Sequence, residues 1–221
     1  MWCIPEASAE YVACMEDVLD LYEEPYQPEQ PMVCYDESPK QLIQETRTPL
    51  PARPGQPERY DYEYERNGVA NLLMFFEPLT CQRQVIVTER HTQQDFAQAM
   101  KWLVDDCHPE AEKIRVVLDN LRTHKKAALY EAFPAAEANR IAKKLEFHYT
   151  PKHGSWLNMV EIELSVYFRR MGERVPNMET LKVIVKAIDE ERNRKHTTVH
   201  WQFTTEDARI KLHSLYPSFS E

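Results

Sequence analysis

The chain has 221 residues, of which 43% are hydrophobic and 29% charged, and its formal net charge is −9. This length is enough to bury a full core, and the composition is that of an ordinary globular protein. No apolar run is long enough to cross a bilayer and the N-terminus lacks the basic-then-apolar order of a signal peptide, so we expect a cytoplasmic protein without a membrane partner.

The first predicted element is a helix over residues 8–24, where apolar residues recur at three-to-four spacing behind Ser8, a favoured N-cap. We assign residues 1–30 to an N-terminal linker helix and its exit. The apolar run 32–35 then predicts a short strand that ends on Asp36 and Glu37.

Residues 45–66 form the most loop-like stretch, since proline, glycine and arginine are concentrated there. A structureless insertion of this length inside a compact domain is either functional or disordered.

The rest of the chain alternates between apolar runs and helical periodicity. A hairpin-like pair of strands comes first, and helices and strands then alternate. The predicted strands are 69–76, 85–88, 114–118 and 145–149, and the predicted helices are 92–107, 123–144 with a break at Pro134, 158–171 and 178–192. A meander followed by alternating helices and strands predicts an α/β fold, a mixed sheet flanked by helices.

Two carboxylates follow predicted strands directly. Asp36 comes after the strand 32–35, and Asp119 comes after the strand 114–118. The carboxyl ends of strands are where α/β sheets place ligand sites. A single acidic residue there often caps the next helix, but two in strands that would be neighbours indicate a metal site.

A third carboxylate lies on the helix after Trp156. Leu157, Glu161, Leu164 and Phe168 fall on one helical stripe, so Glu161 shares the face that packs on the sheet. A carboxylate there is costly to bury unless something positive satisfies it. The alternative is a helix-edge residue that reaches solvent. Glu163 points elsewhere and is the weaker candidate.

Three such carboxylates suit hard divalent ions. Mg²⁺ and Mn²⁺ take oxygen ligands, commonly carboxylates together with substrate phosphate and water. Two ions roughly 3.5–4 Å apart can assist an in-line phosphoryl displacement. Residues 111–200, which include two of the three, hold 17 Lys and Arg against 12 Asp and Glu, a local charge of +5 in an acidic chain. This basic portion is compatible with nucleic acid, although it is also typical of a solvated face.

At these residues the sequence resembles the DDE transposases of the mariner superfamily, in particular the bacterial insertion-sequence branch known as DDE superfamily endonucleases. The likeness runs from about Trp2 to about Phe203 and includes a 41-residue gap between Asp119 and Glu161. Three blocks carry it, namely Val33-Cys34-Tyr35-Asp36-Glu37-Ser38, Val117-Leu118-Asp119-Asn120 with His124, and Trp156-Leu157-Asn158-Met159-Val160-Glu161.

The resemblance implies an RNase-H-like fold, with three antiparallel strands followed by two parallel strands. It implies a catalytic domain over residues 31–203, which includes the insertion 45–66, and a tail over 204–221. Asp36, Asp119 and Glu161 would be the catalytic triad and would hold two Mg²⁺ or Mn²⁺ ions. The activity implied is metal-dependent DNA cleavage and strand transfer for an insertion sequence, by a homodimer in the bacterial cytoplasm, associated with the nucleoid.

Several other residues are candidates for the surroundings of this site. Asn120 could orient the Asp119 loop, and His124 could approach a scissile phosphate. Lys152 and His153 precede the Glu161 helix and could meet the DNA backbone, although a capping or surface role is open for all four. Asn158 is the expected N-cap of its helix, and Trp156 is expected to be a core anchor. In the insertion, Arg47, Arg53 and Arg59 suit phosphate or partner-subunit contacts, with an untethered surface loop as the alternative.

Members of the family also carry an N-terminal helix-turn-helix region that recognises the transposon ends. About thirty residues precede the first catalytic strand here, so we expect any such region to be a separately encoded partner. The alternative function is therefore a catalytically silent, truncated transposase that dimerises with the intact enzyme and regulates it. Another RNase-H-like nuclease, such as a junction resolvase or an integrase, is a third hypothesis, and it would lack the Trp-Leu-Asn-x-x-Glu block.

Overall fold

A computed structural model describes residues 8–217 of the chain. Residues 1–7, which include Trp2 and Cys3, and residues 218–221 lie outside the described part. The helices are α1 (Ala9–Glu23), α2 (Gln93–Trp102), α3 (Ala127–Ala132), α4 (Ala135–Lys144), α5 (Val160–Met171), α6 (Met178–Arg194) and α7 (Thr205–Lys211), and the strands are β1 (Met32–Glu45), β2 (Tyr64–Glu77), β3 (Gln82–Thr88), β4 (Ile114–Leu118) and β5 (Leu145–Tyr149). A π-helical turn, Leu103–Cys107, follows α2, and 3₁₀ turns lie at Ser155–Leu157 and His213–Leu215.

The five strands form one mixed sheet in the order β3-β2-β1-β4-β5. The β1–β2 and β2–β3 pairs are antiparallel, whereas β1–β4 and β4–β5 are parallel. This confirms the predicted α/β class with three antiparallel strands followed by two parallel ones. Parallel neighbours need crossover connections, and here α2 supplies one and α3 with α4 supply the other.

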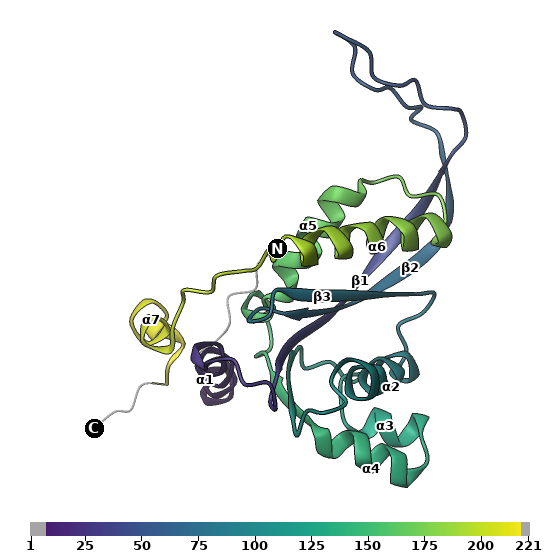
Figure 1. The fold of residues 1–221 in the computed structure, drawn as a ribbon. Helices are drawn as coiled ribbons and strands as arrows, with labels where there is room; N and C mark the ends of the chain where they lie inside the picture. Colours follow the sequence, from purple (N-terminus) through teal and green to yellow (C-terminus); the bar gives the residue numbers. More distant parts are fainter. Residues whose placement is uncertain (1–7, 218–221) are drawn as a thin grey trace.

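Helices cover both faces of the sheet (Figure 1). Successive residues of a strand point to opposite faces, so Leu72 and Leu73 of β2 belong to different cores. One core joins the sheet to α1, α5 and α6, and the other joins it to α2, α3 and α4. Because both faces are covered, β4 is buried along its whole length.

Two predicted boundaries are wrong in the antiparallel part. β1 continues through Asp36 to Glu45, and β2 begins at Tyr64 instead of residue 69. The outer arm of β2 is exposed and that of β1 is mostly polar and half-buried, so neither has the apolar run that predicts a strand, and backbone pairing to each other holds them. The pairing continues as isolated bridges between Leu50 and Arg59, and the predicted loop therefore extends the hairpin away from the sheet (Figure 1).

The other predictions of secondary structure are close to the structure. Ser8 accepts a hydrogen bond from Tyr11 N and is the N-cap of α1. The segment predicted as a helix from residue 123 begins at Ala127, and the chain before it makes a turn in which His124 N donates to Leu121 O. This turn matters because it places His124 beneath the carboxyl end of β4.

The chain after residue 203 returns to the N-terminal helix. In α7, Thr205 Oγ1 donates to Asp20 of α1, and Arg209 makes two hydrogen bonds to Glu16. Figure 1 shows α1 and α7 side by side. In the described part of the chain no helix has the length and apolarity that crossing a membrane requires.

Candidate active site

Asp36 lies where β1 and β4 separate. The parallel pairing of these strands ends at Cys34 and Val117, while β1 continues against β2, with Asp36 opposite Met74. β4 ends one residue later at Leu118, and Asp119 follows it. The two carboxylates therefore share one end of the sheet, as predicted, although Asp36 lies inside its strand and not at the end of it.

The environment of Asp36 favours the protonated acid. Burial raises the pKa of Asp36 to about 7, although the backbone N–H of Glu37 donates to Asp36 Oδ1 at 2.8 Å and acts in the opposite direction. The negative charges of Asp119 and Glu161 contribute to this rise in pKa, and the charge of His124 opposes it. Asp119 and Glu161 thus both lie within electrostatic reach of Asp36.

Glu161 comes to this place through a buried contact between α5 and β1. Asn158 Nδ2 donates to Tyr35 O at 2.9 Å, one residue before Asp36, and Asn158 Oδ1 accepts from Val160 N at 3.4 Å. The N-cap of α5 is Met159, so the prediction of Asn158 as N-cap is wrong by one residue. Asn158 instead connects the start of α5 to β1, a long-range contact that local spacing could not reveal.

Glu163, two residues after Glu161, has a different role. It is buried, accepts two hydrogen bonds from Arg192 at 2.7 and 3.0 Å, and lies 3.0 Å from Arg83 Nε. The expectation that Glu163 points away from the site agrees with this arrangement. Buried charges need paired partners, and here two arginines supply them.

His124 lies behind Asp119. Its side chain is fully buried, its Nδ1 bonds Asp119 Oδ1, and its Nε2 is 3.8 Å from Glu37 Oε1. Burial alone would lower the pKa of His124, but the Asp119 and Glu37 carboxylates outweigh it and raise the pKa to about 9. A ring without exposed surface does not approach a scissile phosphate, so this expectation is wrong for the structure. A buried histidine five residues after a strand-end aspartate carries no local signal for this role.

The three carboxylates suit a divalent cation by their chemistry. In the part of the chain that the structure describes, neither Asp36 nor Glu161 has a Lys, Arg or His within 4.0 Å, and Asp119 has only His124. Carboxylates that repel each other without basic partners are the donor set that Mg²⁺ and Mn²⁺ use. Among the described residues, however, no three His, Cys, Asp or Glu side chains converge closely enough to hold an ion. Asp36, Asp119 and Glu161 therefore fit a divalent ion by their chemistry, and their side chains would have to move closer together to bind it.

The other predicted residues fall into two groups. Lys152 and His153 are exposed in the turn after β5, and this turn begins next to the end of β4, since Thr150 N donates to Leu118 O at 2.9 Å. Asn120 is exposed and accepts a hydrogen bond from Lys125, whose Nζ lies 4.0 Å from the Tyr149 ring centroid. The turn after β5 and Asn120 therefore lie at the carboxyl end of the parallel strands.

The arginines of the insertion are remote from the carboxylates. Arg47 pairs with Asp61 at 3.0 Å, and Arg53 and Arg59 lie in the backbone bridges of the hairpin extension. This extension projects from the body of the molecule (Figure 1). Its base is held by Arg174, which pairs with Glu45 at 2.6 Å. The structure therefore does not bring Arg47, Arg53 and Arg59 together with the triad.

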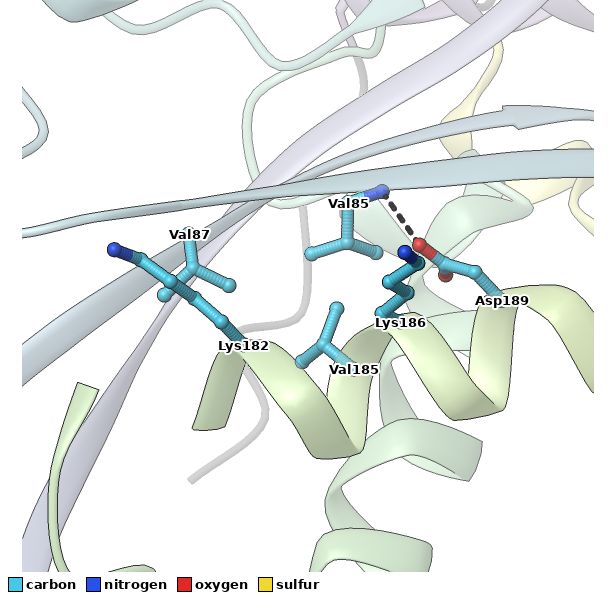
Figure 2. A pocket seen from close by; sticks show the side chains of 6 residues that line it. All are labelled: Val85, Val87, Lys182, Val185, Lys186 and Asp189. Atoms are coloured by element: carbon cyan, nitrogen blue, oxygen red, sulfur yellow. Dashed lines mark hydrogen bonds between the residues drawn. The ribbon is translucent and has the colours of Figure 1, made fainter. Parts of the chain in front are cut away.

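A hollow of about 280 Å³ lies between β3 and α6. Its lining residues are Val85, Val87, Lys182, Val185, Lys186 and Asp189. Figure 2 shows that Asp189 of α6 accepts a hydrogen bond from the backbone N–H of Val85 on the free edge of β3, at 3.3 Å. Because β3 is the edge strand, this hollow is separated from the carboxylates by the width of β2.

Comparisons with known proteins give a family and a fold. The family model described as DDE superfamily endonuclease matches residues 31–182, which contain all three carboxylates. The comparison with curated protein sequences found no match. The chain is similar in fold to the Mos1 mariner paired end complex with Mn, with a TM-score of 0.58 and 13% identity over 100% of this chain and 67% of that one. It is also similar to the Mos1 transposase paired-end complex with left transposon end, with a TM-score of 0.59 and 14% identity over 89% of this chain and 60% of that one. The chain thus spans about two thirds or less of the length of these structures.

Proposed function

The chain belongs to the DDE superfamily endonucleases, and from that premise we propose that it is the catalytic domain of a transposase that cuts and rejoins DNA for an insertion sequence. One observation carries the proposal. Asp36 is half-buried where two parallel strands separate, and the charges of Asp119 and Glu161 act on its carboxylate. This arrangement is electrostatically unfavourable without a cation, so a role in binding metal explains why three acids gather there.

Asp36, Asp119 and Glu161 would hold two Mg²⁺ or Mn²⁺ ions. Ions bound in this way supply charge stabilisation for the attacking and leaving oxygens of a phosphoryl displacement. The chain itself contributes position. β1 and β4 hold two of the carboxylates on a rigid sheet, and Asn158 fixes the start of the helix that carries the third.

DNA is the proposed substrate. Lys152 and His153 lie exposed at the same end of the sheet as Asp119, where cations can contact a phosphate backbone. The Mos1 structures with a similar fold are complexes with transposon ends. Transposon ends and target DNA would both bind at this face. We further propose that the chain acts as a homodimer in a bacterial cell. The hairpin extension, with Arg47, Arg53 and Arg59, would contact the partner subunit. A separately encoded helix-turn-helix portion would be a further partner.

The alternative function is a silent regulator that dimerises with an intact transposase. One observation favours it, because no three potential ligands among the described residues are close enough to hold an ion. The same experiment decides between the two functions.

The test is a nicking and strand-transfer assay with Mn²⁺ and with Mg²⁺. Supercoiled plasmid carrying the DNA that flanks the gene is the substrate, with and without an added helix-turn-helix portion. Asp119→Ala and Glu161→Ala should abolish products. Glu179→Gln should not, since the Glu179 side chain is 84% exposed on α6 and pairs, among residues 8–217, only with Lys182. Absence of nicking by the folded wild-type chain under every condition would reject the enzyme and leave the regulator.

A further inference from the structure

His124 is held by hydrogen bonds to its backbone and by aromatic neighbours of its ring. Its backbone N–H donates to Leu121 O at 3.1 Å, and its carbonyl accepts from the Tyr149 hydroxyl at 2.8 Å. The centroid of the His124 ring lies 4.8 Å from that of Phe96, with the two ring planes tilted by 31°. It lies 5.4 Å from the centroid of Tyr35, in an edge-to-face arrangement. Elements α2, β1 and β5 therefore determine where the two ring nitrogens point.

These nitrogens face two acidic groups on different strands. Nδ1 bonds Oδ1 of Asp119, after β4, and Nε2 faces Oε1 of Glu37 on β1 at 3.8 Å. The N–H of Glu37 donates in turn to Asp36. His124 thus lies in a chain of contacts that runs behind the site from one candidate ligand to another.

Simple packing does not explain a histidine at this place. Nε2 is buried without a hydrogen bond within the described residues, which is unfavourable for a polar atom. A phenylalanine would fill the same space between Phe96 and Tyr35 without that cost. The contact that a phenylalanine lacks is the hydrogen bond to Asp119.

We propose that His124 is a positioning residue, which holds Asp119 with one carboxylate oxygen bound behind the site and leaves the other for a metal ion. This inference rests on the proposed function, because Asp119 is the group that His124 acts through. The Asp119 side chain is 28% exposed, whereas that of His124 has no exposed surface, so the aspartate and not the histidine faces the solvent. Groups that orient a ligand of a metal in this way typically affect metal affinity by about 10–100-fold.

The test compares three substitutions on the full chain. His124→Phe keeps the packing and removes both nitrogens. His124→Asn retains a donor near the Nδ1 position, and His124→Gln places its donor near the Nε2 position. Mn²⁺ affinity without DNA is measured by electron paramagnetic resonance of the free ion, and the Asp119 conformation is determined in crystals of each variant without metal.

We expect about 10–100-fold weaker Mn²⁺ binding for His124→Phe and His124→Gln, and a much smaller loss for His124→Asn. Asp119 should keep its wild-type rotamer only in His124→Asn. Wild-type affinity in His124→Phe, or equal losses in the Asn and Gln variants, would overturn the proposal. If His124→Phe does not fold, the Asn and Gln pair decides.

The crystals also separate this proposal from the proposed function. If wild type neither binds Mn²⁺ nor nicks DNA, the enzyme is rejected, yet the Asp119 rotamer in the variants still tests whether His124 positions it. An unchanged rotamer in His124→Phe would reject the positioning role whether or not the chain cleaves DNA.

Discussion

Two glutamates two residues apart on α5 should respond in opposite ways to mutation. Glu163 is 1% exposed and its carboxylate contacts Arg192 twice and Arg83 once, and the side chain of Arg83 is fully buried. In Glu163→Ala two arginines lose their counter-ion in a site that water does not reach. Removing one partner of a buried ion pair costs about 3–5 kcal/mol, and the second cation places this variant toward the upper end.

That cost is a large fraction of the total stability of a typical protein, which is about 5–15 kcal/mol. For a chain of this size it corresponds to a melting temperature lower by about 6–20 °C. Urea denaturation followed by circular dichroism measures the loss directly. Glu161→Gln is the matched variant, since it removes one of the like charges around Asp36 and should leave stability unchanged or slightly raised while it abolishes nicking.

A loss of less than about 1 kcal/mol in Glu163→Ala would refute the account of the buried ion pairs. Strong destabilisation by Glu161→Gln would refute the separation of roles, because it would mean that Glu161 also stabilises the fold.

Three further results are expected. Asn193→Ala should cost about 2–4 kcal/mol in urea denaturation, because Asn193 pairs the backbone N–H and carbonyl of buried Arg83 at 3.0 and 2.9 Å, and a loss near zero would show that water replaces it. Burial raises the pKa of Asp189 to about 6, so the stability that the protonated carboxyl contributes is present at low pH and lost as pH rises through that value. The free energy of unfolding of wild type should fall by roughly 2–3 kcal/mol relative to that of Asp189→Asn between pH 4 and pH 7. A difference between the two proteins that does not depend on pH would contradict this. Mn²⁺ should raise the melting temperature of wild type and not that of Asp36→Asn, and an equal rise in both would place the ion elsewhere.

The candidate ligands could be predicted from local sequence patterns. Asp119 follows a five-residue strand that is buried throughout and apolar but for Arg115, and Glu161 shares a helical stripe with Leu164. Strand and helix periodicities are short-range properties, so they can be read without knowing which elements touch. The resemblance to mariner-type transposases, which rests on the three short blocks, predicted that these ligands form one site and that the reaction is a phosphoryl transfer.

The surroundings of the ligands depended on contacts between distant residues. Asn158 bonds Tyr35 across 123 residues, and Glu163 bonds Arg192 across 29. The sequence allowed His124 to contact DNA, whereas in the structure Phe96 and Tyr35 pack against its ring. Burial and pairing of a polar side chain are decided by what packs around it, and no periodicity records that.

The sequence by itself determined the α/β class and the order of the elements, and it offered Asp36, Asp119 and Glu161 as candidate ligands, because apolar periodicities and the acids placed on them are local features. Only the tertiary structure decided that β1 runs past Asp36 into a long hairpin, since largely polar strand arms are held by backbone pairing and leave no apolar pattern. The tertiary structure also decided that His124 lies behind Asp119 and that Glu163 belongs to a buried ion network, because free energies of burial depend on neighbours brought together by folding.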